Sequence, residues 1–285
     1  MAEYKGIKGF KVQYLSADPS NPIVGQIWYN DTSKNLKFTE FAAGAWASAT
    51  GMPQGRRNLS AAGIQTAALA FGGYGPYSPV AQGYTDTTFE YDGSTWTSGG
   101  TLGSAMYGNR GFGTQTAALA FGGYLPGSTG ATEEYDGTSW ASNPTGLNTI
   151  RRQLAGCGTQ TAGLAFGGRN PPTTALGSTE EYDGSTWTSV NSMNTARYQL
   201  GGAGTQTAGL AFGGNIPPIT GATEKYDGTS WTTSPASMST ARYGLGGAGT
   251  KSSALAFGGY TPALTAATEE WTGADVKGIK TVTVS

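Results

Sequence analysis

Residues 204–214 read GTQTAGLAFGG, and residues 224–231 read EKYDGTSW. Both phrases recur along the chain. The Gly-Gly doublet that ends the first phrase has its second glycine at Gly73, Gly123, Gly168, Gly214 and Gly259. These glycines are 50, 45, 46 and 45 residues apart. A repeat of this length, with short apolar segments in each unit, is typical of radial all-β architectures.

One unit predicts four short strands, which we place at residues 198–204, at residues 207–212, at residues 223–226 and around Trp231. In the second segment large and small residues alternate, which is the two-residue period of a strand. The Gly-Gly doublet predicts positive φ or close clearance where this strand ends. Asp-Gly before the tryptophan predicts a tight turn. Such a sheet cannot cover its own two faces, so the units predict a closed β-propeller.

The number of blades depends on two divergent copies. In the fifth copy Trp271 stands in the tyrosine place, and Val276 stands where the tryptophan is expected. Near the N-terminus, Phe41 and Trp46 keep the five-residue spacing of the second phrase. We therefore predict an all-β propeller of six four-stranded blades over residues 25–285, with residues 1–24 as an extension. Five blades plus an N-terminal hairpin is the alternative.

Composition limits the function. Lys and Arg total 17 against 18 Asp and Glu, so the chain has no broad basic field for nucleic acid. No segment is apolar enough to predict membrane insertion, and residues 1–14 do not resemble a signal peptide. The sequence contains no histidine and one cysteine, Cys157. We therefore expect no disulfide, metal or other cofactor, and synthesis in the cytoplasm.

The repeat resembles the kelch repeat: Gly-Gly after an apolar strand, then Tyr, then Trp after a short turn. The likeness extends from about residue 25 to residue 275, although Asp-Gly replaces the longer kelch turn. The phrases GQIWYNDTSKNLKF, GTQTAGLAFGG and EEYDGTSWT also look like those of marine bacteriophage proteins, cyanophages included. This second resemblance implies a virion structural or fibre protein, which binds other virion proteins, copies of itself or a host glycan.

Four arginines share one place in the repeat, which Met106 occupies in the remaining unit: Arg56, Arg151, Arg197 and Arg242. We expect them near the loops that enter each blade, as a partial ring for an anion or a sugar carboxylate. In the alternative interpretation each arginine pairs with an acid of the third strand, such as Glu134 or Glu181.

The loops between the second and third strands differ in every unit and open on the same face as these arginines. They begin at Tyr74, Tyr124, Arg169, Asn215 and Tyr260, and Tyr77 lies in the longest of them. Aromatic rings beside polar groups suit sugars and protein partners, so we predict a binding face. The alternative is that the loops only connect strands.

Other chemistry-bearing residues favour structural roles. The aspartates before glycine, such as Asp183, suit turns. Adjacent glutamates such as Glu180 and Glu181 point to opposite faces of a strand and cannot act together on one bond. Cys157 occupies a small-residue position, which predicts a buried filler.

Both termini carry the phrase KGIK, at residues 5–8 and 277–280. It predicts either strands that close the ring or join a second subunit, or ordinary edge strands. Taken together, the composition favours a non-enzymatic protein, and the resemblance to bacteriophage proteins implies a virion component. A cellular protein-interaction propeller is the first alternative, and a glycan-processing propeller enzyme is the second.

Overall fold

The computed structural model describes residues 13–19, 27–38, 49–75, 83–170 and 174–273, and within them every regular element is a β-strand. The chain forms two compact units, Met1–Ala49 and Thr50–Ser285. The boundary predicted from the repeat pattern, after residue 24, falls within the first of these units.

The described part of the N-terminal unit is a three-stranded sheet of β1 (Gln13–Leu15), β2 (Ile27–Asn30) and β3 (Asn35–Phe38). β1 runs parallel to β2, and β2 runs antiparallel to β3. The buried Asn30 side chain donates to Asp18 Oδ1 at 2.7 Å and accepts from the Ser33 N–H at 2.9 Å. These bonds hold the turn that follows β2.

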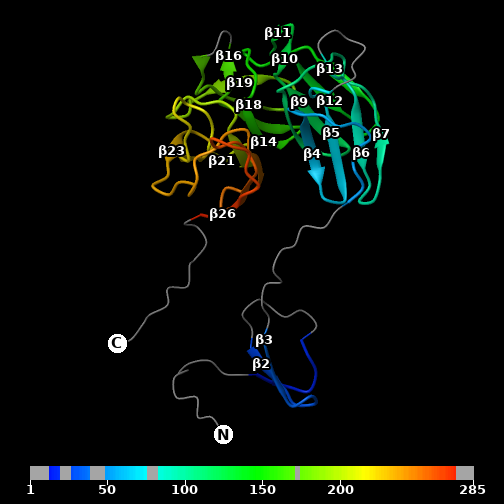
Figure 1. Ribbon diagram of the computed structural model, residues 1–285, viewed down its shortest axis with the longest axis vertical. Helices are drawn as coiled ribbons and strands as arrows, with labels where there is room; N and C mark the ends of the chain where they lie inside the picture. The colour runs from blue at the N-terminus through cyan, green and yellow to red at the C-terminus, as the bar shows by residue number, and fades with distance from the viewer. Residues whose placement is uncertain (1–12, 20–26, 39–48, 76–82, 171–173, 274–285) are drawn as a thin grey trace. The chain divides into compact units, whose positions relative to one another are not determined.

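The C-terminal unit is a β-propeller of five blades (Figure 1). Blade 1 is β4 (Ser60–Ile64), β5 (Ala67–Phe71), β6 (Thr88–Tyr91) and β7 (Trp96–Ser98). Blade 2 is β8 (Arg110–Thr114), β9 (Ala117–Phe121), β12 (Thr132–Tyr135) and β13 (Trp140–Asn143). Blade 3 is β14 (Ala155–Thr159), β15 (Ala162–Phe166), β18 (Thr179–Tyr182) and β19 (Trp187–Val190).

Blade 4 is β20 (Gly201–Thr205), β21 (Ala208–Phe212), β22 (Thr223–Tyr226) and β23 (Trp231–Thr233). Blade 5 has three described strands, β24 (Gly246–Gly249), β25 (Ser253–Phe257) and β26 (Thr268–Thr272). Short pairs β10 (Tyr124–Leu125) with β11 (Gly127–Ser128) and β16 (Arg169–Asn170) with β17 (Thr174–Ala175) lie in the loops of blades 2 and 3. Strands within each blade are antiparallel neighbours in chain order. The predicted strands of blade 4 are confirmed to within a few residues.

The prediction of six blades is wrong, and the five-blade alternative is confirmed. The described N-terminal strands belong to a separate sheet, because β2 pairs with β1 on one side and with β3 on the other. That stretch also lacks the Gly-Gly doublet that ends the second strand of every blade.

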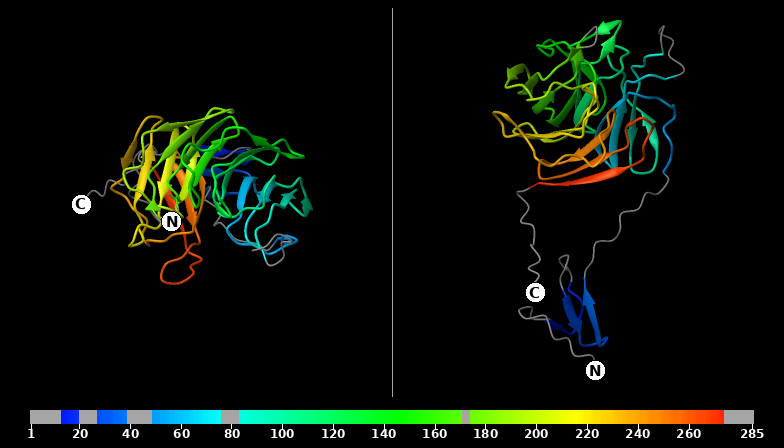
Figure 2. Two further views of the ribbon diagram at one scale, coloured as in Figure 1. Left: turned by 90° about the horizontal axis from the view of Figure 1, so that it is seen from above. Right: turned by 60° about the vertical axis from the view of Figure 1, so that its left-hand side comes forward.

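The core lies between blades, which follow one another side by side (Figure 2). Phe166 of β15 is fully buried, and its ring centroid lies 5.0 Å from that of Trp231 in the next blade. An added Cβ at Gly202 of β20 would lie 2.7 Å from the Phe166 ring. Small residues on the first strand therefore admit the phenylalanine of the preceding blade.

The Gly-Gly doublets adopt the backbone conformation that the sequence predicts. Gly167 and Gly168 have φ of 66° and 103°, values that L side chains rarely adopt. A Cβ at Gly167 would also lie 2.8 Å from the Arg197 carbonyl oxygen. Positive φ and close clearance therefore act together at this position.

Candidate functional site

Every blade places two loop residues side by side at one end of its strands. The residue after Gly-Gly forms a bridge with the residue that follows the repeated Arg or Met position. The pairs are Arg57 with Tyr74, Tyr107 with Tyr124, Arg152 with Arg169, Tyr198 with Asn215 and Tyr243 with Tyr260. We call these ten residues, together with Tyr84, the Tyr/Arg belt. It includes the start of β10 and β16, which Figure 1 shows at the upper end of the propeller.

Four tyrosines from blades 1 and 2 form the densest part of the belt. The Tyr84 ring centroid lies 5.0 Å from that of Tyr107 and 5.9 Å from that of Tyr124, and Tyr74 lies 6.0 Å from Tyr84. Tyr84 is buried, whereas the other three are half-buried. Burial and then the neighbouring phenols raise the pKa of Tyr84. The four rings thus form an aromatic cluster of which three members are partly exposed.

Three arginines lie over tyrosine rings of the belt. Their guanidinium carbons are 4.4 Å to 4.8 Å from the ring centroids: Arg57 over Tyr74, Arg152 over Tyr124 and Arg169 over Tyr198. Within the described residues none of the three has an ion-pair partner. The belt therefore carries positive charge on rigid aromatic surfaces, an arrangement that suits an anionic ligand with flat apolar faces.

Next to the belt is the central channel, of about 530 Å³, which the first strands line. Five residues, one from each blade and each directly after a belt residue, circle it: Asn58, Gly108, Gln153, Gln199 and Gly244. All have positive φ. The backbone N–H of Gln199 donates to Gln153 O at 2.7 Å, and Gly244 donates likewise to Gln199 O at 2.7 Å. These backbone hydrogen bonds join neighbouring blades around the channel, directly beside the belt.

Arg110 of β8 is the one charged residue among the described residues that line the channel. Ser60, Ala155, Gly201 and Gly246 occupy its place in the other blades. Its Nε donates to Leu154 O at 2.7 Å, and burial lowers its pKa. Because the residues at the equivalent positions of the other blades are small, the channel has space for the Arg110 side chain. Arg110 thus adds a further cation near the belt.

The repeated arginines lie in the blades rather than in the belt. Arg151, Arg197 and Arg242 are fully buried, and they form ion pairs with Glu180, Glu224 and Glu269 of the third strands. They offer no surface to a ligand. For these three arginines the geometry agrees with the interpretation in which the repeated arginine pairs with a third-strand acid, although the partners are not Glu134 and Glu181.

Glu134 and Glu181 instead accept hydrogen bonds from the next blade, from the hydroxyls of Tyr182 and Tyr226. Arg56, the fourth arginine of the series, has no acid at the usual place. Its guanidinium lies 4.7 Å from the Phe89 ring centroid and donates to Thr87 O at 2.9 Å.

The loop residues named from the sequence lie at the surface of the belt. Tyr74, Tyr124, Arg169 and Asn215 are half-buried, and Tyr260 is exposed. Tyr77 lies outside the described residues. The sequence reasoning missed the residues opposite them, of which Tyr107, Arg152 and Tyr198 are examples. Their signal is that the position after the repeated Arg or Met is always Arg or Tyr.

The acidic repeat residues have structural partners. Asp183 Oδ1 accepts from the N–H groups of Ser185 and Thr186, both at 2.8 Å, as the turn prediction requires. Glu180 and Glu181 point to opposite faces, since one pairs with Arg151 and the other with Tyr226. No group of acidic or cysteine residues in the described ranges has the geometry of a metal site. Cys157 is buried, and burial raises its pKa to about 12.

No protein-family model matches the chain, and no curated protein matches it in sequence. Among the described residues there is no helix long and apolar enough to cross a membrane.

Proposed function

We propose that this chain is a non-enzymatic binding module whose Tyr/Arg belt takes an acidic glycan. The observation that carries the proposal is the set of arginines over tyrosine rings without carboxylate partners in the described residues. Tyrosine faces pack against the apolar faces of sugar rings, and guanidinium groups donate in a fork that matches a carboxylate. Arg110 in the neighbouring channel adds a donor for a sugar acid.

We further propose that the module belongs to a virion, as a fibre or surface-decoration protein that attaches to host glycans or to other virion proteins. The support is the likeness of its phrases to marine bacteriophage proteins and of its repeat to kelch. Under this proposal the chain is made in the host cytoplasm and acts in the assembled particle.

The proposal that the chain is not an enzyme is supported by its sequence and by the contacts that its acids make. The chain has no histidine, so it lacks the commonest general base. Glu180 and Glu224 are held in buried ion pairs, and Glu134 and Glu181 accept from buried tyrosines. The first two carboxylates are thus occupied within a blade, and the other two join neighbouring blades.

A protein ligand is the second candidate, because the belt is made of residue types that dominate protein interaction hot spots. Tyrosine and arginine are enriched there, and an aromatic platform can anchor either class of ligand. A loop with an acidic residue beside an apolar side chain is the protein segment that this belt fits best.

A glycan array with acidic and neutral oligosaccharides tests the proposal. We expect binding to oligosaccharides with uronic or sialic acids, and a loss of about tenfold or more in affinity for Arg152→Gln, which removes a belt cation. Lys251→Gln is the matched control, since this lysine lies in the turn at the other end of the first strand. Equal binding by both variants, or no binding to any acidic glycan, would contradict the proposal.

A further inference from the structure

The tryptophan of the fourth strand is held in a socket formed with the preceding blade. Trp231 donates its indole N–H to Thr179 Oγ1 at 2.9 Å, and its ring lies 5.0 Å from Phe166 and 5.1 Å from Tyr226. Trp187 and Trp140 bond in the same way to Thr132 and Thr88, both at 2.9 Å. Three indole sockets, each with a threonine acceptor and a phenylalanine wall, are therefore filled.

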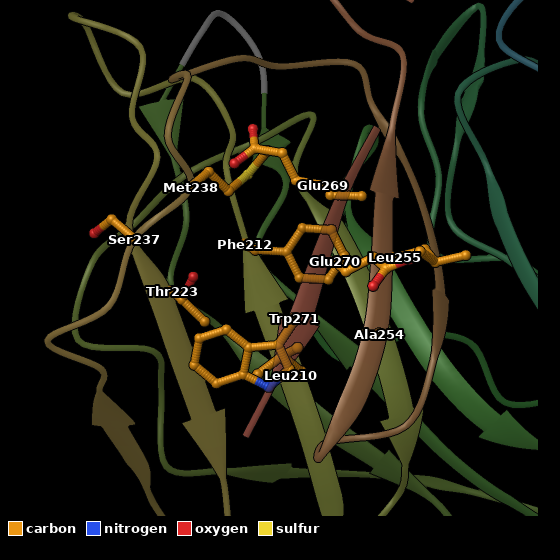
Figure 3. Close-up of a pocket in the computed structure, with 11 residues that line it drawn as sticks. Leu210, Phe212, Thr223, Ser237, Met238, Ala254, Leu255, Glu269, Glu270 and Trp271 are labelled. Atoms are coloured by element: carbon orange, nitrogen blue, oxygen red, sulfur yellow. The ribbon is translucent and has the colours of Figure 1, made fainter. Parts of the chain in front are cut away.

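A fourth socket with the same walls lies between blades 4 and 5 and is a pocket (Figure 3). Phe212 and Thr223 stand where Phe166 and Thr179 stand around Trp231, and Trp271 takes the place of Tyr226. The pocket has a volume of about 60 Å³. The Thr223 hydroxyl has no hydrogen-bond partner among the described residues. The acceptor for an indole N–H is thus present without its donor.

Among the strands that the structure describes, the one beside this socket, β26, has a partner on one edge only. β26 pairs with β25, whereas the third strands of the other four blades each pair with a fourth strand. In the ranges that the structure describes, the outer edge of β26 has no such neighbour. Thr268, Glu270 and Thr272, which share one face of β26, are exposed. An open edge beside an indole socket is a receptor for one more strand.

We propose that this edge and socket bind an extended segment of a partner polypeptide, which adds as the fourth strand of blade 5 and inserts a tryptophan. The chain's own sequence has Val276 five residues after Trp271, where the other units have tryptophan. The valine side chain has no N–H to donate to the Thr223 hydroxyl and is much smaller than an indole. Phe212 and Thr223 are present without a tryptophan at the expected position of this chain, which favours a tryptophan supplied by a partner polypeptide.

The register specifies the residue next to that tryptophan. In blade 3, Tyr182 lies opposite Trp187 and Glu181 lies opposite Thr188. By the same register Glu270 lies opposite the partner residue that follows the tryptophan. Glu270 is exposed and has no ion pair among the described residues. A basic residue there forms an opposite-charge cross-strand pair, so the partner carries Trp followed by Lys or Arg.

A labelled peptide tests the proposal on the full chain. The peptide Asp-Gly-Thr-Ser-Trp-Lys-Thr-Ser copies residues 227–234 with lysine after the tryptophan. Fluorescence anisotropy is expected to show binding that weakens at least tenfold when valine replaces its tryptophan. Thr223→Val is expected to weaken binding about fivefold, through loss of the hydrogen bond to the indole.

Thr179→Val is the matched control, because it makes the same change in a socket that Trp231 already fills. It is expected to lower the melting temperature and to leave peptide affinity unchanged. Equal affinity for the tryptophan and valine peptides, or equal effects of the two threonine variants, would overturn the proposal. Absence of binding would also overturn it. Oligomers that the peptide dissociates would identify a second copy as the occupant. Both results exclude a separate partner.

Peptide binding at the edge of blade 5 does not depend on the glycan site proposed in the Tyr/Arg belt. Arg152→Gln, which tests the proposed glycan site, is expected to leave peptide affinity unchanged. A failure of glycan binding therefore does not affect this inference, and a failure of peptide binding does not affect the proposed function.

Discussion

Glu133 and Glu180 occupy the same place in two blades and have opposite surroundings. Glu180 is paired with Arg151, whereas the corresponding arginine position before Glu133 is Met106. Glu133 accepts from the Gly103 N–H at 2.7 Å and has no cation partner among the described residues. Burial raises its pKa, and the Gly103 bond opposes this only in part. The buried charge is therefore a local weakness at neutral pH.

Glu133→Gln is expected to raise the free energy of unfolding at pH 7, since the amide keeps an acceptor for Gly103 and carries no charge. The wild-type carboxyl favours folding below its unfolded pKa of about 4.3, and this contribution is lost as pH rises through the higher folded pKa. The increase in the free energy of unfolding that Glu133→Gln produces should thus grow between about pH 4 and pH 8, as measured by urea titrations.

Glu180→Gln is the control with the opposite sign, because it breaks a buried ion pair and is expected to cost about 3 kcal/mol. The explanation is wrong if Glu133→Gln destabilises the protein at pH 7 as Glu180→Gln does.

At the scale of the strand, blades 2, 3 and 4 are each joined to the preceding blade by a glutamine that follows the first strand. Gln160 Nε2 donates to Ala118 O at 3.1 Å and to Tyr135 O at 2.8 Å, which belong to the second and third strands of the preceding blade. Gln115 and Gln206 make the equivalent bonds. The Gln of GTQT is therefore an inter-blade contact, a role that the sequence reasoning did not assign.

Gln160→Ala is expected to lower the free energy of unfolding by about 1–3 kcal/mol, because two carbonyl oxygens between blades lose their donor. Gln65→Ala removes the same side chain at an exposed position of blade 1, where it has no described partner, and should change stability by less than about 0.5 kcal/mol. Denaturant titration of the two variants distinguishes an inter-blade contact at Gln160 from a solvated turn residue. Equal losses of stability in the two variants would exclude the inter-blade contact.

At the scale of the whole propeller, the junctions between blades are not equivalent. Phe71, Phe121, Phe166 and Phe212, which end the second strands of blades 1 to 4, are at most 3% exposed. Phe257, at the same place in blade 5, is 36% exposed. Ala61 also stands in blade 1 where the other blades have glycine to admit this phenylalanine. Blade 5 therefore contributes less apolar burial than its neighbours.

Phe166→Ala is expected to cost about 3–5 kcal/mol, because it leaves a cavity against Trp231 in a fully buried junction. Phe257→Ala, the matched change, is expected to cost about 1 kcal/mol, since more than a third of its ring is already in water. Thermal unfolding of the two variants measures the difference. Comparable losses would mean that blade 5 is covered as completely as blade 3.

Much of the candidate site could be predicted from the sequence, but the direction of its side chains could not. Tyr124 and Arg169 follow a Gly-Gly doublet, and this marks them as the first residues of loops. Arg151 and Arg152 are neighbours in sequence, yet one is fully buried and the other lies in the belt. Which neighbour points inward depends on the path of the loop that enters the blade, and the repeat pattern does not encode that path.

The sequence by itself determined the fold class, the strand order within a blade and the turn chemistry, because these depend on local periodicity and on positive-φ glycines. Only the tertiary structure decided the number of blades, the pairing of Arg151 with Glu180 rather than Glu181, and the unfilled indole socket beside Phe212. These features arise from contacts between residues far apart in the sequence, 29 positions in the case of Arg151 and Glu180, or between neighbouring sheets. A repeat unit shows which contacts it offers, whereas the complete arrangement of blades decides which of them are made.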